Sequence, residues 1–299
     1  MKRILILGGS GFVGSNLLEQ ISKNNGYSLF STYNSALPTM FALTEWQQID
    51  LCSGIDLKEY LADINPDCII NLTCLPVNAC DEDPLRANLV QVDAVETIAR
   101  FCGNSKRLIH LSTDMVFSGN KGSLYNYDDA PDPVSGYGRT KLLGEEAVLK
   151  YSHNSVIVRS ALVLGRSKFK KAGFTEWMIG RLEKNEQLPL FIDQYRTPII
   201  VEALCDLICN LVESDWCGIM HAGGGTRLNR VQMGEALIRG MGLSTDLIYK
   251  TLMPELSGIS RMQRDLSMSN NIFNETLEIK WGNPISYLER IGKEIKQKS

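Results

Sequence analysis

The sequence of 299 residues predicts an α/β protein, with a doubly wound parallel sheet and a smaller, mixed α/β C-terminal lobe. Three observations lead to this prediction. A short apolar run at the N-terminus passes directly into a glycine-rich turn and an amphipathic segment. Apolar runs of strand length then alternate with helical segments, as in sheets built from crossover helices. From about residue 165 the alternation loosens, so we expect a larger domain at 1–164 and the smaller lobe at 165–299, with some segments returning to the core of the larger domain.

Composition excludes several classes of protein. Hydrophobic residues make up 44% and charged residues 22% of the chain, which is ordinary for a globular enzyme. A net charge of −3 provides no basic field, so neither nucleic acid nor an anionic membrane is expected as a partner. The apolar run Met1–Leu7 is too short for a signal peptide, and no run approaches the ~20 residues of a membrane span. We therefore expect a cytoplasmic protein.

The first expected strand, Arg3–Leu7, precedes a glycine turn with the spacing G-x-x-G-x-x-G and a helix that runs to about Lys23. Gly8 permits a tight turn, Gly11 lets the backbone approach a pyrophosphate, and Gly14 lets the helix pack closely on the strand. The helix N-terminus offers free N–H groups to phosphates. This context favours a dinucleotide site over a merely structural turn. Its candidate residues are Gly8, Ser10, Gly11, Phe12, Val13 and Gly14.

The second expected strand, Ser28–Thr32, ends where the adenosine ribose of a dinucleotide would lie, at Tyr33 and Asn34. A site that prefers NAD usually has Asp or Glu there, and a carboxylate would repel a 2′-phosphate. This stretch has no carboxylate, so we expect NADP(H) to be preferred and NAD(H) to be possible, although no arginine takes the place of the acid. After a third strand, the expected adenine contacts are Asp50 and Leu51.

Further strands are expected at Asp67–Leu72, Arg107–Leu111 and Asn154–Arg159, and a long helix at Pro84–Cys102. Parallel sheets bind ligands at the edge where the carboxyl ends of their strands meet. Additional cofactor candidates at this edge are Leu72, Thr73 and Ser112. In the C-terminal lobe we expect helices at Phe174–Lys184, Glu202–Val212, Arg230–Met241 and Ile285–Ile295, and a strand at Cys217–His221.

The eight cysteines raise the question of a metal site. Cys205 and Cys209 would share a helix face, and Cys74 and Cys80 flank a loop. Neither pair has Cys-x-x-Cys spacing, and the chain has only three histidines. Zinc sites need closer sets of such ligands, and free cysteines are commonly buried as small apolar residues. No metal is predicted.

Tyr137 and Lys141 lie four residues apart in a segment without proline, which predicts a helix from about Tyr137. Positions i and i+4 share one helix face, so the phenol and the ammonium are expected to lie close to each other on the same side of the helix. The spacing alone also fits an ordinary exposed helix start. Thr113 follows the fifth expected strand, at the edge of the sheet that binds ligands, although a simple turn hydroxyl is the alternative there.

The glycine turn, the strand-end hydroxyl and Tyr-x-x-x-Lys, in this order, resemble the extended short-chain dehydrogenase/reductase superfamily, which has the Rossmann fold. Within it the chain is most similar to the dTDP-4-dehydrorhamnose reductases and their sugar-nucleotide relatives. The resemblance covers nearly the whole chain and is carried by Leu111–Phe117, Tyr137–Glu145, Val158–Ser160, Asp193–Pro198, Gly218–His221 and Arg261–Arg264.

The resemblance implies a reductase that moves a hydride from the cofactor to a ketone. Tyr137 is the candidate acid, Thr113 a donor to the developing alkoxide, and Lys141 an electrostatic helper. Lys141 also holds the nicotinamide ribose in this family, so both helix residues count among the cofactor contacts. An ammonium ~4 Å from the phenol at a dielectric of ~20 contributes roughly 4 kcal/mol, enough to lower the tyrosine pKa of ~10 by up to ~3 units.

The implied substrate is a 4-keto nucleotide-linked deoxysugar, as in dTDP-rhamnose biosynthesis, and its candidate contacts are Asp114, Met115, Leu162 and Arg196. Related 4,6-dehydratases carry Thr-Asp-Glu, so Met115 at the third position disfavours dehydration. Rhamnose-type reductases usually have tyrosine in place of Met115 and tryptophan in place of Leu162. Asp93 replaces an asparagine common in extended members. The identity of the sugar therefore stays open.

Two alternatives remain. A sugar-nucleotide epimerase would keep NAD bound and recycle it, which the missing acid after the second strand disfavours. A non-catalytic subunit is the other, because the regulatory subunit of methionine adenosyltransferase resembles this fold. The superfamily often pairs the helices near Pro84–Cys102 and Tyr137–Tyr151 between subunits, so a homodimer is possible.

Overall fold

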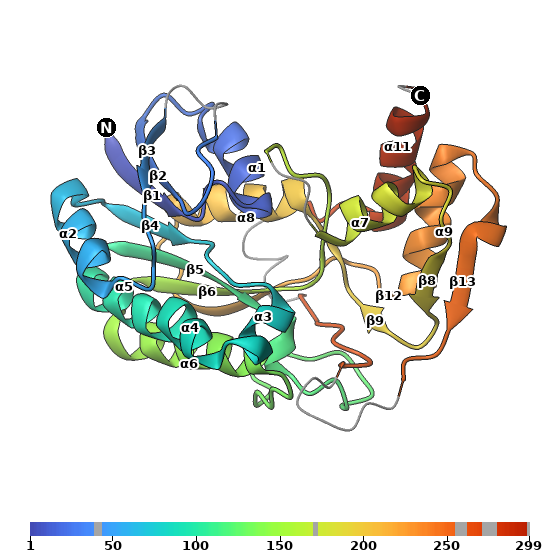
Figure 1. Cartoon of the computed structure of the whole chain (residues 1–299). Coiled ribbons are helices and arrows are strands. Elements are labelled where there is room, and N and C mark those ends of the chain that lie inside the picture. The colour runs from blue at the N-terminus through green and yellow to red at the C-terminus, as the bar shows by residue number, and fades with distance from the viewer. Residues whose placement is uncertain (39–43, 170–172, 255–261, 271–279, 298–299) are drawn as a thin grey trace.

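A seven-stranded sheet forms the centre of the computed structural model, which describes residues 1–38, 44–169, 173–254, 262–270 and 280–297 (Figure 1). Its strand order is β11-β6-β5-β4-β1-β2-β3, and every neighbouring pair is parallel. The strands are β1 (Lys2–Leu7), β2 (Tyr27–Tyr33), β3 (Thr44–Gln48), β4 (Cys68–Asn71), β5 (Arg107–Thr113), β6 (Ser155–Ser160) and β11 (Gly218–Ala222). The order reverses between β1 and β4, which opens a crevice at their carboxyl ends.

Side chains that alternate along β1 divide the core into two layers. Ile4 and Ile6 pack with α1 (Phe12–Ile21) and α8 (Val201–Glu213) on one face. Leu5 and Leu7 pack on the other face with α2 (Gly54–Ile64), α5 (Ala94–Cys102) and α6 (Gly136–Tyr151). Strands buried on both faces are typical of parallel sheets covered by crossover helices. The helices cover both faces of the sheet in Figure 1, so the predicted doubly wound fold is confirmed.

The long helix expected at Pro84–Cys102 is not regular. It consists of α4 (Pro84–Asn88), a π-helical turn (Leu89–Asp93) and α5. A short helix, α3 (Val77–Glu82), precedes it. Neither α3 nor α2 was expected from the sequence. The π-helical turn widens the helix beside α6, and such turns are frequent at functional sites.

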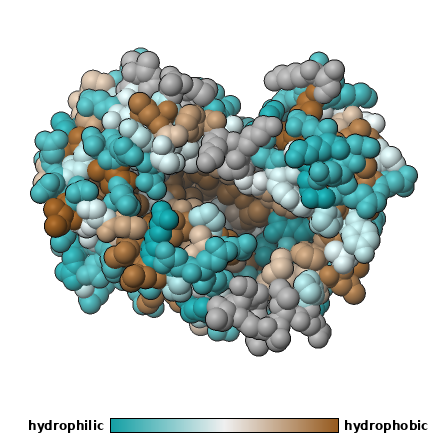
Figure 2. All heavy atoms as spheres, in the orientation of Figure 1, coloured by the Kyte–Doolittle hydropathy of each residue, from teal (hydrophilic) through white to brown (hydrophobic). Residues whose placement is uncertain are grey.

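The C-terminal lobe has a second hydrophobic core. Its main elements are α7 (Gly173–Leu182), β8 (Leu188–Phe191), α9 (Arg230–Met241), β13 (Ile248–Thr251) and α11 (Pro284–Lys296). The lobe also contains two short strand pairs. In one, β7 (Val163–Leu164) pairs with β10 (Ile199–Ile200), and in the other, β9 (Tyr195–Arg196) pairs with β12 (Leu228–Asn229). Two elements from beyond residue 165, β11 and α8, belong instead to the central sheet and its cover. Figure 2 shows the surface hollowed between the two parts, above an apolar floor. Within the described part of the chain, no helix has the length and apolar character needed to cross a bilayer.

Candidate active site

The turn after β1 has the geometry expected of its glycines. Gly8 has a φ of +84°, in the left-handed region that glycine adopts without strain. Its carbonyl oxygen accepts a hydrogen bond of 3.0 Å from the Gly11 N–H. A Cβ on Gly14 would collide with that same carbonyl and with the backbone of Gly9. The close approach of α1 to the turn therefore requires glycine at position 14.

A cavity of about 350 Å³ opens in front of this turn. All the cofactor candidates that follow the first four strands line this cavity. Its lining is Gly8, Ser10, Gly11, Phe12, Val13, Gly14, Thr32, Tyr33, Asn34, Ile49, Asp50, Leu51, Leu72, Thr73, Cys74, Leu75, Arg86, Val90 and Leu111. Three cofactor candidates, Ser112, Tyr137 and Lys141, are not part of this lining. Arg86 was not singled out from the sequence, because it lies on α4, far along the chain from the other adenosine-side residues.

Ser112 connects β5 to α6. Its hydroxyl donates to the carboxylate of Glu145, which is buried. Glu145 in turn accepts a hydrogen bond of 2.7 Å from Nη2 of Arg159, and both side chains are almost completely enclosed. The Ser112 hydroxyl thus faces α6, within a buried ion pair that joins α6 to β5 and β6.

Tyr137 and Lys141 lie on the first turns of α6, whose N-terminus is capped by the Ser135 side chain. The Lys141 ammonium is buried and donates a hydrogen bond of 2.7 Å to the carbonyl oxygen of Leu111. Leu111 also lines the cofactor cavity. The lysine is therefore held against the cavity wall at the carboxyl end of β5.

The pKa of Tyr137 differs from the expectation. Burial, the largest effect, raises it well above its usual value of 10.0, and Cys74, Asp114 and Cys80 raise it further. Burial also lowers the pKa of Lys141. The expected lowering of the tyrosine pKa by Lys141 is therefore not found, because the desolvation of the phenol has the largest effect.

Gln91, on the π-helical turn, is a buried polar residue that sequence reasoning missed. Its amide nitrogen donates to the Thr140 hydroxyl at 2.6 Å, and its oxygen accepts from the Leu75 N–H at 2.9 Å. It joins the loop after β4 to α6, beside Lys141. Asp93, the residue that the sequence comparison pointed to, is exposed on the other side of the helix.

Thr113 is the last residue of β5 rather than the residue after it. Its hydroxyl accepts a hydrogen bond from the Met115 N–H and donates one to the Asp114 carboxylate, both at 3.2 Å. Asp114 is buried. Burial raises its pKa, and this effect outweighs the opposite effects of Arg196, Thr113 and Arg230.

Two arginines of the C-terminal lobe, the buried Arg196 and the half-buried Arg230, act on Asp114. Arg196 Nε lies 3.5 Å from the Asp114 carboxylate. Arg230, at the start of α9, donates a hydrogen bond of 2.7 Å to Gln194, and its guanidinium lies over the Phe174 ring. Burial and the neighbouring Arg196 lower the pKa of Arg230 to about 9. Arg230 was not expected from the sequence, because only the folding of the lobe brings α9 towards β5.

The remaining substrate candidates are partly buried. Met115 packs against the cluster around Phe117. Leu162 packs against the core of the C-terminal lobe, and its carbonyl oxygen accepts from the Ile199 N–H at 3.0 Å. Arg261, part of the last resembling segment, lies outside the described residues.

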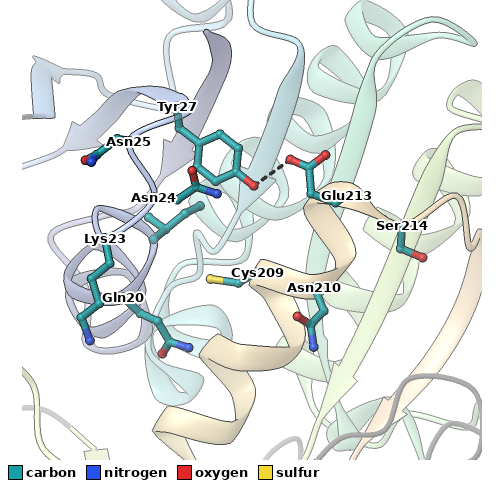
Figure 3. A pocket seen from close by; sticks show the side chains of 10 residues that line it. Gln20, Lys23, Asn24, Asn25, Tyr27, Cys209, Asn210, Glu213 and Ser214 are labelled. Atoms are coloured by element: carbon teal, nitrogen blue, oxygen red, sulfur yellow. Dashed lines mark hydrogen bonds between the residues drawn. The ribbon is translucent and has the colours of Figure 1, made fainter.

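A different cavity, of about 690 Å³, lies between the C-terminal ends of α1 and α8 (Figure 3). Tyr27 donates a hydrogen bond of 2.7 Å to Glu213 across it. Burial raises the pKa of the Cys209 thiol at its edge to about 11. None of the site candidates lines this cavity. Across the described ranges, no three His, Cys, Asp or Glu side chains are grouped to hold a metal ion.

Comparisons with known proteins place the chain in a family. Residues 1–276 match the family model described as RmlD substrate binding domain. The chain is 28% identical to a probable low-salt glycan biosynthesis reductase, Agl14, from Haloferax volcanii, over 84% of each chain. It is 28% identical to dTDP-4-dehydrorhamnose reductase from Mycolicibacterium smegmatis, over 83% of this chain and 72% of the relative. The beta subunit of methionine adenosyltransferase 2 from Danio rerio is 26% identical, over 88% and 81%.

Solved structures show the same fold. A dTDP-4-dehydrorhamnose reductase from Bacillus anthracis, in complex with NADP, superposes with a TM-score of 0.82 at 19% identity, covering 98% of this chain and all of the other. A hypothetical dTDP-4-dehydrorhamnose reductase from Sulfolobus tokodaii superposes with a TM-score of 0.80 at 26% identity, covering 93% and 96%.

Proposed function

The chain belongs to the RmlD substrate binding domain family of NAD(P)-dependent oxidoreductases, and on that premise we propose that it uses NADPH to reduce a keto group of a nucleotide-linked deoxysugar. The family resemblance predicted from the sequence is confirmed. NADP(H) is the preferred cofactor of this proposal and NAD(H) a possible one.

One observation carries the proposal. Lys141 donates its hydrogen bond to Leu111, a residue of the nucleotide-sized cavity in front of the glycine turn. Tyr137 lies one helical turn before Lys141 on the same face of α6. Leu111 thus links the proposed proton-transfer pair to the cavity, and this supports a site at the crevice where open parallel sheets bind ligands.

The residues fit the reduction of a ketone. The bound cofactor supplies the hydride. The Tyr137 hydroxyl, protonated near neutral pH as in any tyrosine, can give a proton to the oxygen that becomes the alcohol. The Thr113 hydroxyl, at the end of β5, stabilises the negative charge that develops on this oxygen. Lys141 would hold the nicotinamide ribose, and its charge favours the tyrosinate that remains after proton transfer, against the burial that raises the Tyr137 pKa.

Asp114, Arg196 and Arg230 support an anionic substrate. The buried Arg196 and the half-buried Arg230 bring two guanidiniums near the buried Asp114 carboxylate, and Asp265 is a further acidic neighbour of Arg196. These guanidiniums would bind the diphosphate of a nucleotide sugar. Met115 has no acidic group, which supports reduction rather than dehydration. A 4-keto sugar of dTDP-rhamnose biosynthesis is our first candidate, since a curated relative is named dTDP-4-dehydrorhamnose reductase.

The test is the oxidation of NADPH by the purified protein with a panel of 4-keto nucleotide sugars, including dTDP-4-dehydrorhamnose. The proposal expects turnover with at least one of them and the loss of that turnover in Tyr137→Phe. Binding of NADPH without turnover of any sugar in the panel would count against it. Mass analysis of the nucleotide released from the purified protein distinguishes a reductase from the alternative, a sugar-nucleotide epimerase, because an epimerase would carry one bound NAD per chain.

A non-catalytic regulatory subunit is a second candidate, supported by the similarity to the beta subunit of methionine adenosyltransferase 2. In that case Tyr137→Phe would leave the cellular function of the protein unchanged. The homodimer and the cytoplasmic location stay predictions, which light scattering of the purified protein and cell fractionation would test.

A further inference from the structure

The adenosine end of the cofactor cavity contains a cation that β2 does not provide. Tyr33 and Asn34, at the end of β2, line the cavity without any charge. Among the described residues that line it, Arg86 is the one with a cationic side chain and Asp50 the one with an anionic side chain. Arg86, on α4, is therefore the candidate for the arginine that a 2′-phosphate site usually places after β2.

The start of α4 positions Arg86. Pro84 occupies the first turn, and the Asp83 side chain caps the helix by accepting a hydrogen bond of 3.0 Å from the Arg86 N–H. The side chain of Arg86 is exposed at the cavity mouth. Its guanidinium lies near the Cys52 thiol, where it opposes the rise of the thiol pKa that burial and Asp50 cause. The Asp50 carboxylate is itself engaged by the Cys52 N–H at 3.0 Å.

We infer that Arg86 selects NADP(H) over NAD(H) by binding the 2′-phosphate of the adenosine ribose. This inference rests on the proposed function, since it assumes that the cavity holds a dinucleotide. The guanidinium makes charge-assisted, bidentate hydrogen bonds to phosphate oxygens. Hydrogen bonds to charged groups have a net effect on the order of a ten- to hundredfold change in affinity. NADH has a neutral 2′-hydroxyl at this position, so its affinity should depend little on the Arg86 charge.

The experiment measures dissociation constants of NADPH and NADH from the fluorescence of the reduced nicotinamide, for the wild type, Arg86→Gln and Arg86→Lys. Displacement of NADPH by 2′,5′-ADP and by 5′-ADP isolates the contribution of the 2′-phosphate. Arg100→Gln is the matched control. It removes one positive charge from an exposed arginine of α5 that does not line the cavity.

Arg86→Gln should weaken the binding of NADPH and 2′,5′-ADP about ten- to hundredfold and leave the binding of NADH and 5′-ADP unchanged. Arg86→Lys should keep part of the lost affinity for NADPH and 2′,5′-ADP. Arg100→Gln should bind all four nucleotides as the wild type does. Equal weakening of NADPH and NADH would mean that Arg86 stacks on the adenine, and no weakening would mean that it points to solvent. Either result overturns the inference while the proposed function stands. If the wild type binds neither dinucleotide, the proposed function fails together with it.

Discussion

The Lys141 ammonium donates a hydrogen bond to the carbonyl oxygen of Leu111, and this bond ties α6 to the wall of the cofactor cavity. An ammonium has three N–H donors, and the hydrogen bond to Leu111 uses one of them. Ribose hydroxyls of a cofactor in this cavity would accept hydrogen bonds from the others.

Lys141→Met removes these donors while it keeps a long apolar side chain in the buried space. We expect a fall in kcat of about a hundredfold, with a weaker affinity for NADPH. Steady-state kinetics and a fluorescence titration check both effects. Lys150→Met, at the exposed end of the same helix, is the control and should change neither value.

Tyr137→Phe removes the proposed proton donor and little else. Loss of a general acid lowers the rate by roughly a hundred- to ten-thousandfold, whereas NADPH affinity and the melting temperature should stay close to those of the wild type. Tyr151→Phe, at the last turn of α6, is the matched control. A Tyr137→Phe enzyme with more than a tenth of the wild-type kcat would exclude the tyrosine as the essential acid.

Glu145→Ala should destabilise the fold by about 3–5 kcal/mol, because it leaves the buried guanidinium of Arg159 without its counter-charge. Urea unfolding measures the change in the free energy of unfolding. Glu146→Ala, one residue further on the exposed face of α6, should change it by less than about 0.5 kcal/mol. Similar values for the two variants would contradict a stabilising role for the ion pair.

Gly14→Ala should weaken NADPH binding by on the order of tenfold or more, because the new methyl group pushes α1 away from the turn that holds the pyrophosphate. Gly180→Ala is the control, because the added methyl group has free space there. This residue lies within α7, and a Cβ there meets no other atom within 4 Å. It should leave cofactor affinity unchanged and stabilise the protein by up to ~1 kcal/mol.

Acid should destabilise the protein through His221. Burial and the nearby Arg159 lower the pKa of this histidine from 6.5 to about 4. A lowered folded-state pKa means that the stabilisation is complete above about pH 6.5 and is lost as the pH falls through about 4. The loss amounts to about 3 kcal/mol. His110, whose pKa burial also lowers, acts in the same direction.

Urea unfolding between pH 7.5 and 4.5 tests this dependence, since His221→Leu should flatten the curve over this range. The exposed His153 is the control, and His153→Gln should retain the wild-type slope. A slope unchanged in His221→Leu would show that other groups cause the acid sensitivity.

Much of the fold could be predicted because its signals are local. A strand, a glycine turn and a helix follow one another within the first residues, and apolar runs predicted a strand near each of the seven strands of the main sheet. The order of the strands in the sheet was not predicted, and the pairing of β11 with β6 joins distant parts of the chain. The helix α2 was missed although Ser53 caps it in an ordinary way, since its apolar residues are few.

The residues of the candidate site also fall into those that could be predicted from local sequence and those that could not. The spacing of Tyr137 and Lys141 placed them on one helix face, because the pitch of a helix is the same in every protein. Arg86, Gln91 and Arg230 were beyond prediction, since each reaches the site from a different segment and only the packing of helices on the sheet sets its distance to the cavity. The Tyr137 pKa was mispredicted for a related reason: helical spacing brings Lys141 near, but burial by the surrounding fold has the larger effect.

Sequence order alone thus specified the class of fold, the nucleotide turn and the pair of residues proposed to move the proton, because these depend on contiguous residues and fixed helical geometry. The tertiary structure decided which charges surround that pair, that Arg86 lines the cavity, and that Arg196 and Arg230 lie near Asp114. Those properties depend on desolvation and on distances between remote segments, and both exist only once the chain has folded.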